Sequence, residues 1–197
     1  VVAAWGDRFV IRRYSPPITI GGGQVLEPHP RKRKVADEAL EAQKQSLISG
    51  DLAAAVEAKL RLVADDFCSA NELAGGCGRG VEEMRATLLQ LQTKGYAVTR
   101  DVEHQLNGVH TIHWERLTDA VYAGLQAYHV DNPLKQGLRR QELRSLTARY
   151  VRQELFDHVL DHLAASGRIA LDGSVVRARD HGIRFSPQEE ELKNQIE

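Results

Sequence analysis

One pattern of residues occurs twice in this chain, 72 residues apart, and it limits the possible folds more than any other feature. The matched positions are Met84, Thr87, Leu88, Leu91 and Gly95 and, in the same order, Phe156, Val159, Leu160, Leu163 and Gly167. The first four positions of each set share one face of an α-helix, and the glycine ends that helix. Five matches at a single offset indicate an internal duplication of structure.

The residues around the first copy predict a winged-helix domain over 37–114. Helices are expected over 37–49, 52–64 and 80–94, with Asp37 and Asp51 as caps of the first two. A short helix starts at the capping box formed by Ser69 and Glu72, and nearby glycines interrupt it. Strands over 96–100 and 109–113 form a hairpin, whose turn we expect at Asn107-Gly108. Helix, short helix, turn, helix and hairpin is the winged-helix plan, in which the hairpin is the wing.

The second copy predicts another winged-helix domain over 115–185. Helices are expected over 115–128, 138–147 and 151–166, and Asn132-Pro133 ends the first of them. The wing strands cover 168–171 and 174–177 and turn on Asp172-Gly173. After them, Ser186 and Pro187 begin a further helix signal. We therefore expect 186–197 to be the truncated start of a third winged-helix domain.

The first 30 residues read as β-structure. A strand is expected over 8–14, Pro16-Pro17 breaks it, and a second strand begins at 18–20 before three glycines. Such a small antiparallel unit is marginal by itself in water. We expect residues 1–26 to pack poorly or to expose a strand edge. A basic linker over 31–36 follows, and it contains four consecutive cations.

Composition excludes some classes of protein. The hydrophobic fraction of 42% and the charged fraction of 27% are ordinary for a globular protein. No apolar run approaches the roughly 20 residues of a membrane-spanning helix. Cys68 and Cys77 make neither a disulfide framework nor a four-ligand zinc site, so a reduced, cytoplasmic location is the simplest expectation. The chain begins in mid-strand, and we expect it to be a piece of a longer protein.

The motifs together resemble one family. A strand reading Arg-Phe-Val-Ile-Arg-Arg-Tyr-Ser-Pro over 8–16, then Thr-Ile-Gly-Gly-Gly over 19–23, leads through a basic linker into tandem winged helices. This order closely resembles SelB, the bacterial selenocysteine-specific elongation factors, over essentially the whole chain. The resemblance implies that 1–30 is the end of an elongation-factor β-barrel domain. The expected fold is mainly α, of the α+β class: tandem winged-helix domains preceded by a short β-barrel remnant.

The resemblance also implies a function. The family's full-length factor is a GTPase, with GTP and magnesium as cofactors, that delivers selenocysteinyl-tRNA to the ribosome and is tethered to a selenoprotein mRNA hairpin. No glycine-rich segment here is followed by Lys-Ser/Thr, so we expect neither a cofactor nor enzyme activity in this portion. Its expected role is a monomeric spacer and RNA-contacting arm between the tRNA-binding body and the hairpin-binding domains.

Candidate RNA contacts are basic, because phosphate contacts supply most of the affinity for nucleic acid. They are Arg12, Arg13, Arg31, Lys32, Arg33, Lys34, Arg139, Arg140, Arg144, Arg149 and Arg152. For each, the alternative is an ordinary solvated surface. The third helix of the first domain is a poorer candidate, because Glu82 and Glu83 lie beside Arg85 and would repel phosphates.

Other interpretations remain open from the sequence. A winged-helix regulator that binds DNA is the main alternative, although the outward positions of the third helices offer a weak set of base-reading side chains. An enzyme is a third interpretation, without a recognisable nucleophile and base. His158 and His162, one helical turn apart, could hold a metal, but no further ligand is apparent and no metal site is expected.

Overall fold

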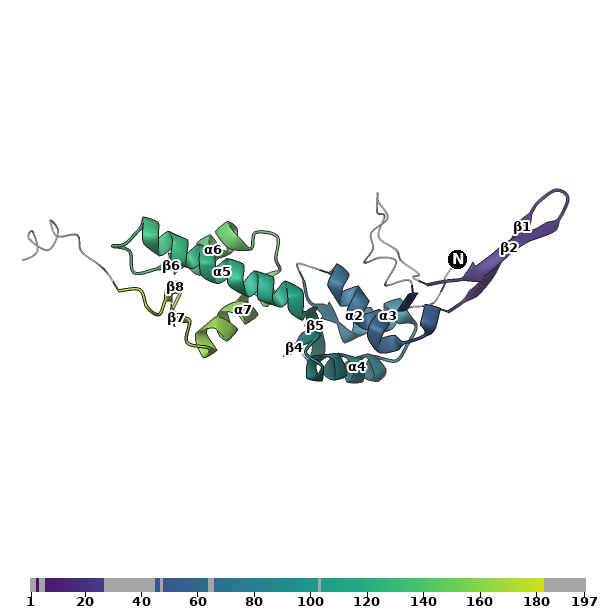
Figure 1. Ribbon diagram of the computed structural model, residues 1–197, viewed down its shortest axis with the longest axis horizontal. Helices are drawn as coiled ribbons and strands as arrows, with labels where there is room; N and C mark the ends of the chain where they lie inside the picture. The colour runs from purple at the N-terminus through teal and green to yellow at the C-terminus, as the bar shows by residue number, and fades with distance from the viewer. Residues whose placement is uncertain are drawn as a thin grey trace, which may run out of the picture. The chain divides into compact units, whose positions relative to one another are not determined.

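The computed structural model describes residues 3, 6–26, 45–46, 48–63, 66–102 and 104–182. The chain divides into two compact units, Val1–Ile112 and His113–Glu197, and each combines helices with small antiparallel sheets (Figure 1). This agrees with the predicted α+β class. The predicted basic linker and the helix signal after residue 185 lie outside the described residues, as does most of the predicted helix over 37–49. Within the described residues, no helix is long and apolar enough to cross a membrane.

The winged-helix part of the first unit contains three helices and a three-stranded sheet. The elements are α2 (Leu52–Leu62), β3 (Cys68–Ser69), α3 (Ala70–Cys77), α4 (Val81–Thr93), β4 (Ala97–Val102) and β5 (Gln105–His110). Asp51 caps α2, since its carboxylate accepts a hydrogen bond from the Ala54 backbone at 3.1 Å. The capping box is confirmed: Glu72 N–H donates to the Ser69 hydroxyl at 3.1 Å, and Ser69 N–H donates to the Glu72 carboxylate at 2.8 Å.

The predicted turn of the first wing is wrong. Strands β4 and β5 pair from Ala97 opposite His110 to Val102 opposite Gln105, so Asn107 and Gly108 lie inside β5. The reason for the glycine is close packing. A Cβ on Gly108 would lie 2.7 Å from a methyl group of Leu88, a core residue of α4. The two-residue strand β3, which the sequence did not predict, pairs with the same part of β5.

The second unit repeats this plan. Its elements are α5 (Thr111–Asp131), β6 (Leu138–Arg139), α6 (Arg140–Thr147), α7 (Gln153–Ala165), β7 (Ile169–Asp172) and β8 (Val175–Ala178), and α5 crosses the boundary between the units. The predicted strand over 109–113 is therefore too long, because residues 111–113 begin a helix. The second wing turns at Gly173-Ser174, one residue later than predicted.

The structural repeat is confirmed. Helices α4 and α7 match end to end at an offset of 72, and both three-stranded sheets place the last strand between the other two. Gly95 and Gly167 have φ angles of 79° and 72°, which favour glycine after each helix. The predicted face of α4 is buried at Met84, Thr87, Leu88 and Leu91, and that of α7 at Phe156, Val159, Leu160 and Leu163.

The N-terminal strands form a two-stranded ribbon, drawn in purple in Figure 1. They are β1 (Arg8–Arg13) and β2 (Ile18–Gln24), and every residue of both is exposed. This confirms the predicted exposed edge. Strand β2 continues through the three glycines, where a bend was expected. Gly23 lies opposite Phe9, and a Cβ there would lie 2.9 Å from the Phe9 ring, so the glycine makes room for that ring.

Candidate nucleic-acid interface

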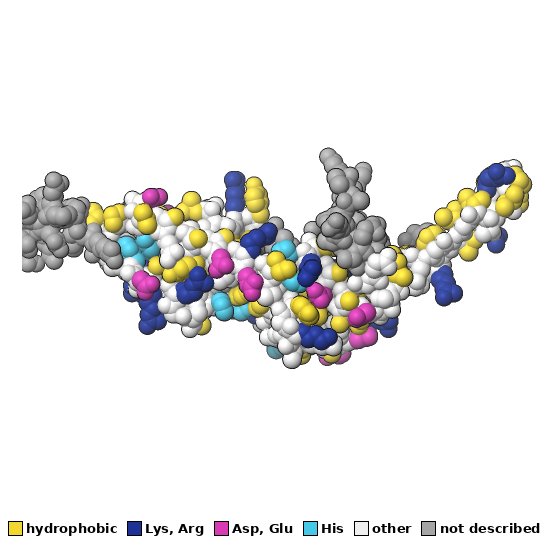
Figure 2. Space-filling model, viewed as in Figure 1, with side chains coloured by type: hydrophobic (Ala, Val, Ile, Leu, Met, Phe, Trp, Pro, Cys, Tyr) yellow, Lys and Arg dark blue, Asp and Glu magenta, His cyan; other side chains and the backbone are white. Residues whose placement is uncertain are grey.

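Five of the predicted contacts surround the helix-turn-helix of the second unit. They are Arg139 and Arg140 at the start of α6, Arg144 within α6, and Arg149 and Arg152 between α6 and α7. Figure 2 shows that Lys and Arg side chains on the visible face are interspersed with Asp and Glu rather than gathered into one basic surface. The environment of each arginine therefore decides what it can contribute.

Arg144 holds the turn that follows its own helix. Its Nε and Nη2 atoms donate to the Val151 carbonyl at 3.1 and 2.6 Å. Two charge-assisted donors on one carbonyl make a strong, directional contact. Its guanidinium is thus already used within the fold, and the residue positions the turn rather than offering a free cation.

Arg139, Arg149 and Arg152 are exposed. In the described part of the chain, no acidic side chain forms an ion pair with Arg139 or Arg149. Arg149 instead lies beside an aromatic ring, with its Cζ 5.8 Å from the ring centroid of Tyr150. Arg140 is half-buried; its backbone N–H donates to the Ser174 carbonyl at 3.0 Å, and its Nε has no described hydrogen-bond partner.

Arginines of the first unit lie next to acids. Arg79 is 4.0 Å from Glu83. Arg85 is 3.9 Å from Glu82 and 3.6 Å from Asp101. Exposed pairs of this kind add little stability, but they cancel the positive potential that would attract phosphate. The geometry thus agrees with the expectation that the first winged helix is the poorer candidate.

The remaining predicted contacts lie near the N-terminus. Arg12 and Arg13 are neighbouring residues of β1, opposite Thr19 and Ile18, and both are exposed. Arg31, Lys32, Arg33 and Lys34 lie outside the described residues. Arg12 and Arg13 are therefore accessible on the ribbon of the first unit, whereas the arginines around α6 belong to the second unit.

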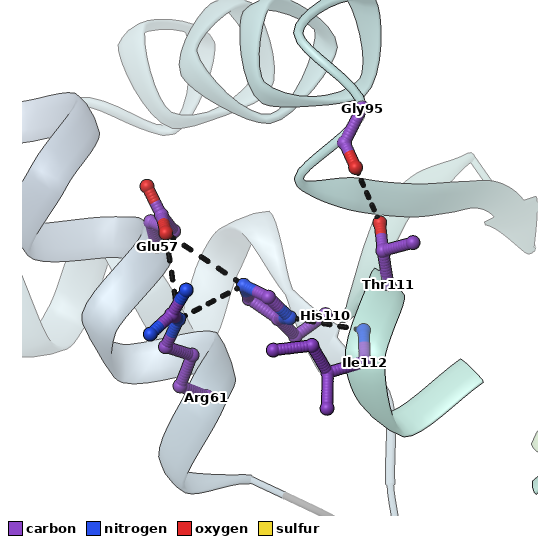
Figure 3. A network of polar contacts seen from close by, with 6 residues as sticks. All are labelled: Glu57, Arg61, Gly95, His110, Thr111 and Ile112. Atoms are coloured by element: carbon purple, nitrogen blue, oxygen red, sulfur yellow. Dashed lines mark hydrogen bonds and ion pairs between the residues drawn. The ribbon is translucent and has the colours of Figure 1, made fainter. Parts of the chain in front are cut away.

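A buried histidine organises the start of α5. His110 is 2% exposed, and its Nδ1 accepts a hydrogen bond from Ile112 N–H at 3.1 Å (Figure 3). A neutral imidazole then carries its proton on Nε2, which lies 3.7 Å from the Glu57 carboxylate and 3.2 Å from Arg61 Nε. That proton is directed at Glu57, since Arg61 Nε is itself a donor. The group ties α2 to the end of β5 and is structural.

Two further histidine groups belong to the second unit. His158 and His162 pack their rings against Trp114, with centroid distances of 4.9 and 5.3 Å. Their contact with an indole gives this pair a packing role. No group of three or more metal-ligating side chains occurs among the residues described.

His129 is buried near the end of α5. Its Nε2 accepts a hydrogen bond from Ala178 N–H at 3.1 Å, and its ring stacks on His181 with a centroid distance of 3.7 Å. Burial, together with the neighbouring His181, lowers the pKa of His129 below its usual 6.5. The neutral ring therefore links α5 to the second wing.

Cys68 and Cys77 are free and buried. Burial, reinforced by the charge of Glu72, raises the pKa of the Cys68 thiol to about 12. A thiol that stays protonated is a poor nucleophile. Cys68 therefore acts as a small core residue.

Sequence reasoning missed one exposed residue of the second helix-turn-helix. Tyr150 is 83% exposed and lies between two of the predicted arginines. Its signal was available, because the 72-residue offset and the two short helices together imply a longer turn in the second copy.

Fold and surface define the class first: this is a tandem winged-helix protein with an exposed N-terminal hairpin. Residues 122–177 match the family model described as "Elongation factor SelB, winged helix". The chain is also 26% identical, over 200 residues, to the selenocysteine-specific elongation factor of Desulfomicrobium baculatum. That alignment covers 98% of this chain and 30% of the relative, so the chain spans about a third of the relative's length. The predicted resemblance to SelB is confirmed.

One solved structure is similar as well. It is the mRNA-binding domain of elongation factor SelB from E. coli in complex with SECIS RNA. The sequence identity is 16% and the TM-score 0.48, and the match covers 66% of this chain and 98% of that chain.

Proposed function

We propose that this chain is the middle portion of a selenocysteine-specific elongation factor, comprising the edge of a β-barrel domain and two winged helices. In this role it spans the distance between the tRNA-binding body and the domains that hold the mRNA hairpin, and it contacts RNA on the way. The observation that carries the proposal is the SelB winged-helix match at 122–177, which lies inside the second unit. Similarity to a selenocysteine-specific elongation factor over 98% of the chain supports it.

The proposed activity of this portion is binding, not catalysis. GTP, magnesium and the GTPase reaction would belong to another part of the parent factor. The partners would be selenocysteinyl-tRNA, the selenoprotein mRNA hairpin and the ribosome, and the location would be the cytoplasm. Each winged helix is suited to a spacer because a buried helix face and a three-stranded sheet stiffen it.

The second winged helix is the proposed RNA-contacting part. Arg139 and Arg149 are exposed there without a described acidic partner, whereas Arg79 and Arg85 in the first unit lie beside acids. Unpaired arginines can replace counterions on RNA phosphates, which makes the binding dependent on salt. We expect modest affinity that falls steeply as salt is raised.

Fluorescence anisotropy of the full chain tests this function. Labelled selenocysteine tRNA, a selenoprotein mRNA hairpin and a duplex DNA of mixed sequence are titrated at low and at raised salt. We expect salt-dependent binding to RNA, with no sequence preference on DNA. If no RNA binds at low salt, the chain is a spacer only. Salt-resistant, sequence-dependent binding to DNA would instead favour a winged-helix transcription regulator.

A further inference from the structure

The two helix-turn-helix motifs differ in the length of their turns. Helix α3 ends at Cys77 and α4 begins at Val81, which leaves three residues between them. Helix α6 ends at Thr147 and α7 begins at Gln153, which leaves five. Since the flanking helices are otherwise matched, the second unit has two additional residues at the turn.

The longer turn is held firmly at both ends. Ala148 and Val151 are 4% and 6% exposed, so they anchor it in the core. Val151 N–H donates to the Ala148 carbonyl at 3.0 Å, and the Arg144 guanidinium binds the Val151 carbonyl from the other side. The two residues between these anchors are therefore presented outward on a rigid support.

Those two residues are Arg149 and Tyr150. The Tyr150 side chain is 83% exposed, which is unusual for a large aromatic ring in an ordered turn. Arg149 lies near the ring, at a distance suited to a cation–π contact. The surrounding sequence from 137 to 153 contains five arginines and a single acid, Glu142.

An exposed aromatic ring flanked by cations has the chemistry of a single-stranded nucleic-acid site. Unpaired bases stack on aromatic side chains, while neighbouring cations hold the phosphates on either side. A duplex cannot use the ring in this way, because its bases are already stacked. The corresponding turn of the first unit contains Gly78 and Gly80 and offers no ring.

We propose that Tyr150 is a stacking site for an unpaired base of RNA, with Arg149 and Arg152 binding the adjacent phosphates. This inference rests on the proposed function, and it assigns that function's RNA contact to the elongated turn of the second winged helix. A single-stranded loop, bulge or end is the form of RNA that it selects.

Anisotropy titrations with the full chain test the site. The probes are a labelled single-stranded RNA of about 12 nucleotides, within the range of common single-strand sites, and a duplex of the same sequence. Tyr150→Ala should weaken binding of the single strand about fivefold or more, the effect typical of removing one ring on which a base stacks. Tyr150→Phe keeps the ring and should bind like the wild type. Neither substitution should change duplex binding.

Matched controls exclude general effects. Tyr96→Ala removes a tyrosine of the first unit that is 44% exposed, and it should leave both affinities unchanged. Leu146→Ala removes an exposed apolar side chain of α6 near the turn, and it should also have no effect. Circular dichroism should show an unchanged fold for Tyr150→Ala, because the ring packs little against the core.

The outcomes separate two failures. If the wild type binds single-stranded RNA and Tyr150→Ala binds it equally well, the stacking site is wrong, while the proposed RNA contact stands. An equal loss with Tyr150→Phe, or an equal loss on duplex RNA, also overturns stacking. If the wild type binds neither RNA at low salt, the RNA contact of the proposed function fails, and the stacking site fails with it.

Discussion

The two winged helices share a scaffold but differ at the surface where a helix-turn-helix protein meets a partner. Helices α4 and α7 have the same length, and both sheets have the same strand order. In the first unit the turn is short and the nearby arginines are matched by acids. In the second unit the turn is two residues longer and carries exposed Arg149 and Tyr150. The difference teaches that duplication preserved the core while the surfaces diverged, and that the second surface is the one suited to RNA.

The largest expected effect concerns what the two units share. Met84 and Phe156 occupy matched positions and are fully buried. Met84→Ala should lower the free energy of unfolding of the first unit by about 2–5 kcal/mol, and Phe156→Ala that of the second by about 3–5 kcal/mol, because each leaves a cavity. Hydrogen exchange resolved by residue would measure both. Loss of protection in both units from a single substitution would contradict two independent cores.

Arg144 tests what only the second turn requires. Arg144→Ala removes both hydrogen bonds to the Val151 carbonyl and should destabilise the second unit by about 1.5–3 kcal/mol, the range for bonds to charged groups. Thermal unfolding would measure the loss. Arg144→Lys is the matched control: it keeps the charge but cannot reproduce the planar, two-pronged contact, so most of the loss should remain. Full recovery with lysine would show that charge alone matters.

The helix caps give a smaller, opposite pair of effects. Ser69 caps α3, and Ser69→Ala should cost about 1 kcal/mol. Arg139 occupies the same position before α6 and makes no side-chain cap. Arg139→Ser should therefore stabilise the second unit by up to about 1 kcal/mol while weakening RNA binding. Chemical denaturation measures the first change and anisotropy the second. Stabilisation without any loss of RNA affinity would remove Arg139 from the interface.

The effect of pH should be modest and confined to the second unit as far as His129 is concerned. The pKa of His129 is lowered in the fold, so the unfolded chain binds a proton more readily below pH 6.5. The free energy of unfolding should therefore fall as pH drops below about 6.5 and be unaffected by this group above it. Unfolding midpoints measured across this range test the sign. His129→Gln, whose amide oxygen can accept from Ala178 N–H without titrating, should reduce the dependence.

The parts of the fold that could be predicted are those in which sequence periodicity reports burial. The faces of α4 and α7 and the cap at Ser69 follow directly from local residue types. The first wing could not be placed this way, because Gly108 reads as a turn residue but is required by contact with Leu88, which is distant in sequence. Likewise, charge alone made Arg144 a candidate for binding RNA, and its use by the Val151 carbonyl became visible only in the folded turn.

The central claim is that the second winged helix, and not the first, contacts RNA. It is tested most directly by the salt dependence of RNA binding for two triple variants of the full chain. Replacing Arg139, Arg149 and Arg152 with alanine should weaken binding and reduce the slope of log affinity against log salt by roughly 0.7 for each phosphate that is no longer neutralised. Replacing Arg79, Arg85 and Arg100 should leave affinity and slope nearly unchanged. Equal losses from both triples, or a larger loss from the second, would contradict the account.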